Sequence, residues 1–324
     1  MKIQNNRLKN LLRNNTFIML LVAIAVIVFF FCINKNYLSL ANIQTVLLTI
    51  SFDGLLTLGA ALVLIGGNVD LSTGAVACFS GCLFGLACNA GIPWGIALAL
   101  GILVGLILGL INALLINELK FMSFISTLAV AQVYRGFVDY WLTGRNIQIT
   151  NPGVRVLGAT IAGIPVAFLI FIIVLIVYAV ILNTRRVGRS IYLIGGNAEA
   201  ARLSGVNPKK MSYFIYINSA FVCALAGIIW TCRMHTIATT TGTGGETNAL
   251  TAAVLGGFQF PLIHIVLILP HSDRLRINFY QLCQRIHETP SNRRPYGKNA
   301  NPHIANAPKT INTNWLLKLL AAVP

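Results

Sequence analysis

Long apolar segments alternate with short polar ones along most of the chain. A helix of about 20 apolar residues spans the hydrocarbon core of a bilayer, where the backbone must satisfy its own hydrogen bonds. The pattern therefore predicts an all-α fold, a polytopic membrane helix bundle of about eight spans. The predicted spans are 17–33, 45–65, 74–90, 94–116, 121–142, 160–182 and 213–232, with an eighth that begins near Ala249.

Composition agrees with a chain that lipid surrounds. Of the 324 residues, 56% are hydrophobic and 10% are charged, whereas a soluble domain carries about 25% charged residues. The formal net charge is +16, but the basic residues gather at predicted membrane edges and near the C-terminus, and they form no aromatic-interleaved binding face. We therefore expect contact with the headgroups of a lipid bilayer and no nucleic-acid partner.

Basic residues also predict the orientation, since loops rich in Lys and Arg stay in the cytoplasm. Residues 1–13 carry four of them, and the segment 185–210 carries six. Six predicted spans lie between the two segments, an even number, so both are expected inside. The segment 144–159 is then outside, the turn 117–120 is inside, and the N-terminus is cytoplasmic.

Small residues repeat at four-residue spacing in one predicted span, at Gly101, Gly105 and Gly109. Such a stripe lets two helices approach closely. It predicts tight packing against a neighbouring helix, and a sliding interface in a moving bundle is the alternative.

Ionisable residues inside spans are costly, and they usually face protein or water with a partner. Asp53 lies in the second span, and Arg135 and Asp139 lie four residues apart in the fifth. Two pairings of Arg135 are open: with Asp53 across helices, or with Asp139 along one helix. A transport-path role and a purely local role, with Asp53 near the outer interface, are both open.

The segment 66–74 (GGNVDLSTG) predicts a non-helical break between two spans. Its glycines permit a tight turn, and the side chains of Asp70 and Ser72 can cap the next helix. Broken backbone at membrane depth normally lines a cavity, so a ligand-lining role is open beside a simple break.

Polar side chains in spans tend to face the bundle interior, where they line a path or bond neighbouring helices. The candidates for a translocation path are Asp53, Asn68, Asp70, Ser72, Asn112, Thr127, Gln132 and Arg135, with Ser123 and Ser126 as further pore-facing residues.

The basic segment 185–210 contains the signals of a short capped helix. Asn197 is a good N-cap, Glu199 suits the positive end of a helix, and Gly205 suits the position after the helix ends. Gly195 and Gly196 would free the angle at which the chain enters it. A helix of about two turns is not stable alone in water, so a partner or the bundle must hold it. A coupling helix and an ordinary headgroup-binding loop are both consistent with these residues.

A resemblance favours the first of these. Residues 188–205 (GRSIYLIGGNAEAARLSG) resemble the cytoplasmic signature of bacterial ABC-type permeases for ribose, arabinose and autoinducer-2, GR-x-x-x-A-I-G-G-N-x-x-A-A-x-L-x-G-I. Residues 67–74 are similar to that family's GGIDLSVG, with Asn68 and Thr73 as departures. Residues 124–136 (FISTLAVAQVYRG) and 242–257 (GTGGETNALTAAVLGG) resemble two further motifs in the same order.

The resemblance implies a permease subunit of a high-affinity sugar importer in a bacterial inner membrane. Its implied partners are two cytosolic ABC ATPase subunits, a periplasmic sugar-binding protein and a second permease subunit. The implied ATPase-coupling residues are Gly195, Gly196, Asn197, Glu199, Ala200, Arg202, Leu203 and Gly205.

An enzyme is not expected. The chain has no G-x-x-x-x-G-K-[ST] phosphate loop, so ATP hydrolysis would lie on another chain. We find no catalytic constellation and no metal-ligand spacing, and we predict no cofactor. Two alternatives stay open: a channel or secondary transporter driven by an ion gradient, in which Asp53, Asp70 and Asp139 carry ions, and a membrane scaffold that does not transport.

The C-terminal part departs from the family pattern. Residues 258–324 are basic and rich in histidine and proline, and they lack a credible span after residue 269. We expect a permease domain over 1–257 and an aberrant, disordered tail over 258–324, caused by disruption of the gene or reading frame near Gly257. A genuine variant with a disordered tail is the alternative. Disruption would leave the bundle incomplete, with poor assembly and little transport.

Overall fold

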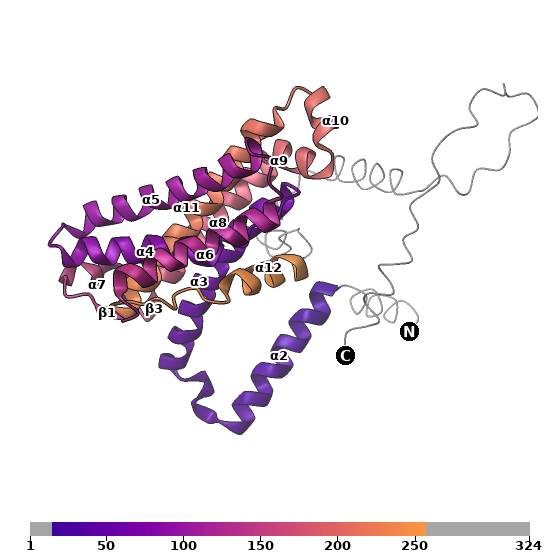
Figure 1. Ribbon diagram of the computed structural model, residues 1–324. Helices are drawn as coiled ribbons and strands as arrows, with labels where there is room; N and C mark the ends of the chain where they lie inside the picture. The colour runs from indigo at the N-terminus through magenta and orange to yellow at the C-terminus, as the bar shows by residue number, and fades with distance from the viewer. Residues whose placement is uncertain (1–14, 257–324) are drawn as a thin grey trace, which may run out of the picture. The chain divides into compact units, whose positions relative to one another are not determined.

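The computed structural model describes residues 15–256, which fold almost entirely into α-helices (Figure 1). The long helices are α2 (Asn15–Ile33), α3 (Leu40–Ile65), α4 (Thr73–Asn89), α5 (Trp94–Asn117), α6 (Ser123–Leu142), α8 (Val166–Thr184) and α11 (Pro208–Met234). The shorter elements are η1 (Lys35–Leu38), β1 (Ile147–Gln148), η2 (Pro152–Val154), α7 (Arg155–Gly158), β2 (Thr160–Ile161), β3 (Ile164–Pro165), α9 (Arg186–Gly196), α10 (Ala198–Leu203), β4 (Thr236–Ile237) and α12 (Gly245–Leu255).

Helices occupy all eight predicted span positions, which confirms the all-α membrane fold. Among the described residues, α3, α5, α8 and α11 are long and apolar enough to cross a bilayer, and α4 and part of α2 are shorter apolar helices. Several predicted helix starts are wrong, among them that of α11, which begins at Pro208 rather than at 213. α3 begins at Leu40, because the Ser39 hydroxyl accepts a hydrogen bond from the Asn42 N–H and caps it. Residues 160–165 form the β2–β3 hairpin rather than the start of a helix.

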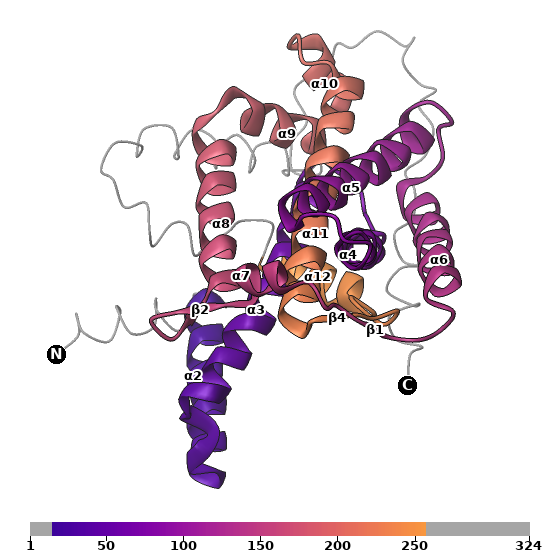
Figure 2. The same cartoon turned by 90° about the vertical axis from the view of Figure 1, so that its left-hand side faces the viewer.

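Helix α4 is the centre of the described bundle. It contacts α5, α6, α11 and α12, and Figure 2 views it almost end-on among them. Most of its side chains are buried, and so is one face each of α3 and α11. The part of the break next to α4, residues 70–72, is also buried, whereas Gly67 at its other end is exposed.

The glycine stripe of α5 packs against α11. A side chain at Gly105 would overlap Ala224, and one at Gly109 would overlap Ala220. Tight helix packing is thus the role of this stripe, as predicted.

The two ends of the bundle carry the segments that the topology assigns to opposite sides. At one end, Lys209 Nζ lies 2.8 Å from the Glu118 carboxylate, which joins the turn 117–120 to the start of α11. At the other end, β1 from the segment 144–159 pairs antiparallel with β4, after α11. The grouping of the loops agrees with the prediction, while the basic residues 1–13 lie outside the described residues.

The Glu118 contact should depend on pH. Hydrogen bonds from Lys209 and then Tyr213 lower the pKa of the Glu118 carboxyl below its ordinary value near 4.5. A carboxyl whose pKa is lowered by folding stabilises the folded state at pH values above its unfolded-state pKa. This stabilisation is lost as the pH falls through its folded-state pKa. Spin labels at Asn117 and Lys210 should therefore give a narrow distance distribution at neutral pH that broadens below pH 4.5. In the Glu118→Gln variant this distance distribution should be broad at every pH. A wild-type distribution that does not change with pH would contradict the prediction.

Candidate functional site

The helix α10 has the capping that its sequence predicts. Asn197 Oδ1 accepts hydrogen bonds from the backbone N–H groups of Glu199 and Ala200, both at 3.0 Å. Gly205 adopts a positive φ of 83° just beyond the helix. One side chain, Ala201, is buried against the rest of the fold, whereas Leu203 is 80% exposed. The result is a short helix that is capped at both ends, and the side that carries Leu203 is exposed among the described residues.

The expectation for Gly195 and Gly196 is wrong, since both are helical residues at the end of α9. A side chain on Gly195 would overlap the Ile65 carbonyl at the end of α3, so the glycine is there for close approach rather than for flexibility. The apolar spacing of Val187, Ile191 and Ile194 was the missed signal of this helix. Ile191 is only 1% exposed.

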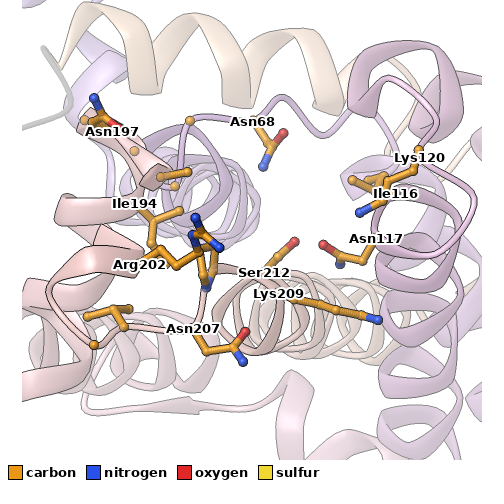
Figure 3. A pocket seen from close by; sticks show the side chains of 18 residues that line it. Asn68, Ile116, Asn117, Lys120, Ile194, Asn197, Arg202, Asn207, Lys209 and Ser212 are labelled. Atoms are coloured by element: carbon orange, nitrogen blue, oxygen red, sulfur yellow. The ribbon is translucent and has the colours of Figure 1, made fainter. Parts of the chain in front are cut away.

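A cavity of about 910 Å³ lies beside α10 (Figure 3). The end of α9, the start of α11, the turn 117–120 and the break at Asn68 surround it. Lys120, Arg202 and Lys209 contribute positive charge to its lining. Asn68, a predicted path residue, therefore lies at the end of the bundle that carries α10.

The break 66–72 is fixed by side chains of α6. The Ser123 hydroxyl accepts from the Val69 N–H at 3.3 Å, and the Thr127 hydroxyl accepts from the Leu71 N–H at 3.1 Å. Backbone donors that a helix would have satisfied are thus satisfied by neighbouring hydroxyls.

Asp70 and Ser72 do not cap α4 with their side chains, which corrects the prediction. Asp70 Oδ1 instead accepts from the Ser72 N–H at 2.8 Å and from the Ser72 hydroxyl at 2.6 Å. The Asn112 amide then donates to the same hydroxyl at 2.7 Å. This cluster joins the break to α5, and its three side chains are almost fully buried.

The partner of Arg135 is Glu246, so both predicted pairings are wrong. Arg135 Nη2 lies 3.3 Å from Glu246 Oε2 and donates to the Gly242 carbonyl at 2.9 Å. Nη1 also reaches the Thr241 carbonyl and the Thr243 hydroxyl. Glu246 was overlooked because it lies in the first turn of α12, before the predicted start of the eighth span near Ala249.

The four motif segments meet in two places. A side chain on Gly74 would overlap Glu246 and the Gly242 carbonyl, beside Arg135, so the segments 67–74, 124–136 and 242–257 converge there. At the other end of the break, Gly67 packs against Gly195. The segment 67–74 therefore touches α9 at one end and the Arg135–Glu246 pair at the other.

The other predicted path residues lie in several different places. Asp53 lines a second cavity, of about 540 Å³, with Trp230 and the segment 236–245. Ser126 is buried, while Gln132 is exposed on the outer face of α6. The predicted set thus divides among two cavities, the buried cluster at Asp70, and α6.

The fold defines a polytopic helical membrane protein, and comparison with known proteins shows that it is a permease and gives its family. Residues 42–287 match the family described as branched-chain amino acid transport system / permease component. The chain belongs to this family, in the branch of ABC permeases that includes the ribose, arabinose and autoinducer-2 proteins.

Three relatives illustrate the similarity. The ribose import permease protein RbsC of Bacillus subtilis is 35% identical over 69% of this chain and 71% of its own length. The autoinducer 2 import system permease protein LsrC of Salmonella choleraesuis is 30% identical, over 78% and 73%. The L-arabinose transport system permease protein AraH of Escherichia coli is 33% identical, over 74% and 72%. No solved structure matches the chain.

Proposed function

We propose that the chain is the membrane-spanning subunit of an ATP-driven importer that moves a sugar or sugar-like molecule into the cytoplasm. The names of its relatives, which are import permeases for ribose, arabinose and autoinducer 2, support this over an ion-driven transporter. ATP hydrolysis belongs to separate ABC ATPase subunits, a periplasmic binding protein delivers the substrate, and a second permease subunit completes the complex.

In this proposal α10 is the helix on which the ATPase docks, and the N-terminus and the turn 117–120 face the same cytoplasmic side. The observation that carries the proposal is the exposure of Leu203 at 80%, on a helix otherwise anchored by the buried Ala201. Together with the resemblance of residues 188–205 to the family's cytoplasmic signature, this exposed apolar side chain supports a protein-binding surface at α10. Glu199 and Arg202, paired with each other and both exposed, lie one turn apart beside it.

We expect Leu203→Asp to reduce recovery of the ATPase with the permease at least tenfold, because a charge replaces an apolar contact at the centre of the interface. The measurement is co-purification of the tagged full-length permease with its co-expressed ATPase. Leu119→Asp is the matched control, since Leu119 is also exposed at the same end of the bundle but lies outside α10. Equal recovery from the Leu203→Asp and wild-type chains would contradict docking through α10.

The cavity that Asp53 lines is our candidate for the substrate path. Phe52 and Trp230 give it aromatic surface, and Asn146 and Asn248 give it amide groups. A few polar groups beside aromatic rings suit a polyhydroxylated ligand. Asn68, Asp70, Ser72, Asn112, Thr127, Gln132 and Arg135 remain further path candidates.

The aberrant-tail hypothesis falls on residues 258–324, outside the described residues. Disruption near Gly257, and the poor assembly and low transport that would follow from it, remain proposals. Translating the encoding DNA in all reading frames tests them, because another frame is expected to continue the family's sequence after Gly257. If no frame does so, the hypothesis of disruption is wrong.

A further inference from the structure

Buried polar groups without hydrogen-bond partners gather around Asp70. Asn112 Oδ1, the Tyr216 hydroxyl and the Ser219 hydroxyl are unbonded, and each of these residues is at most 1% exposed. The Ser219 hydroxyl lies within reach of the Asp70 carboxyl but does not meet hydrogen-bond geometry, and Tyr216 lies near enough to feel the carboxylate charge. Since the large majority of buried polar atoms in proteins are hydrogen-bonded, such a group of unbonded oxygens is typical of a place that holds water or an ion.

The Asp70 carboxylate also lacks a compensating charge among residues 15–256. Its hydrogen bonds from Ser72 both end on Oδ1, and the ion pairs of the described residues involve other carboxylates. Removing an ionised carboxylate from water costs several kcal/mol unless a counter-charge or hydrogen bonds offset it. At 4% exposure, Asp70 therefore needs either a proton or a cation.

Polar side chains lie along α11 between the cavity beside α10 and this carboxylate. Ser212, Tyr216 and Ser219 follow each other at i, i+4 and i+7 on α11, so they share one helix face. Ser212 lines the cavity (Figure 3), and its hydroxyl is buried and unbonded as well. A hydrated ion in the cavity would meet oxygen atoms at each turn of the helix.

We propose that the Asp70 cluster binds an alkali-metal cation together with water. Asp70 Oδ2, Asn112 Oδ1 and the hydroxyls of Tyr216 and Ser219 are the available oxygens. Hard cations take such oxygen ligands, and one carboxylate among neutral oxygens balances a single positive charge. All of these ligands are oxygens, whereas transition metals favour imidazole and thiolate ligands. The ion is a resident of the fold, and it stabilises the break before α4.

The test is thermal unfolding of the full-length chain in detergent, at constant ionic strength, in NaCl, KCl or LiCl against N-methyl-D-glucamine chloride. A ligand of the native state raises its stability with the logarithm of concentration. We expect at least one alkali cation to raise the midpoint by roughly 3–6 °C at ten times its Kd. Asp70→Asn should abolish the rise, and Asp139→Asn, at an exposed carboxylate on α6, should keep it.

A second pair of variants covers the case in which Asp70→Asn does not fold. Tyr216→Phe and Ser219→Ala retain the carboxylate, and each should raise the cation concentration for the half-maximal shift about fivefold, as one lost ligand of ~1 kcal/mol does. Identical midpoints in alkali and N-methyl-D-glucamine salts would mean that a proton or water alone occupies the cluster, and would overturn the proposal. A rise that is unchanged in all three variants would also overturn it.

Discussion

Replacing Gly195 by valine should be among the most damaging single substitutions in the described part of the chain. The new side chain would overlap the Ile65 carbonyl, and a backbone group cannot move aside as a flexible side chain can. Overpacking of this kind costs up to about 3 kcal/mol, which corresponds to a fall of roughly 6–12 °C in the thermal midpoint. Fluorescence-detected size-exclusion chromatography of the heated, detergent-solubilised protein measures this midpoint.

Gly196→Val is the matched control, because an added side chain at Gly196 meets nothing within 4 Å. Both glycines end the same helix and share its loss of backbone freedom, so the pair isolates the contact with Ile65. The Gly196 variant should stay within about 1 kcal/mol of wild type. Equal effects at the two positions would show that α9 does not pack on the end of α3 as described.

Replacing Arg135 by methionine should have the second large effect. Its guanidinium joins Glu246 to two carbonyls and a hydroxyl of the segment 241–243. The two charged side chains are 17% and 23% exposed, so we expect a cost of about 2 kcal/mol, below the ~3–5 kcal/mol of a fully buried pair. Glu246→Gln should cost less, because Arg135 keeps its other three acceptors.

The double variant Arg135→Met/Glu246→Gln tests the pairing. It should be less destabilised than the sum of the single variants, by about 1 kcal/mol, since no charge is left alone. The exposed Glu199–Arg202 pair is the control, where single neutral substitutions should change stability by less than about 1 kcal/mol. Strictly additive effects at Arg135 and Glu246 would contradict a direct interaction.

Local patterns predicted the parts of this protein that local physics controls. Apolar runs located the long helices, and Asn197 with Gly205 located α10, because capping is decided by adjacent residues. Contacts between helices across the bundle could not be predicted from local patterns. The sequence suggested Asp139, by its spacing, and Asp53, on another helix, as partners of Arg135. The actual partner is a third carboxylate, Glu246, which tertiary packing brings near. Gly195 was interpreted as flexible because the carbonyl it accommodates lies 130 residues earlier in the sequence.

The candidate path residues show the same division. Asp70, Ser72, Asn112 and Thr127 do lie in the interior, as polar side chains in spans should. Gln132 does not, since its helix face is left open by the described residues. Periodicity gives the faces of a helix, but which face meets protein depends on neighbours that are distant in sequence.

The contacts at both ends of the segment 67–74 have a thermodynamic consequence. Gly67 abuts α9, where an added Cβ would lie a tight 3.3 Å from Gly195 Cα, and Gly74 abuts the Arg135–Glu246 pair, where an added Cβ would overlap Glu246. If this segment has two positions, a ligand that favours one of them at the first junction favours it at the second. If a second ligand binds at the other junction, each ligand then changes the affinity for the other by the same factor.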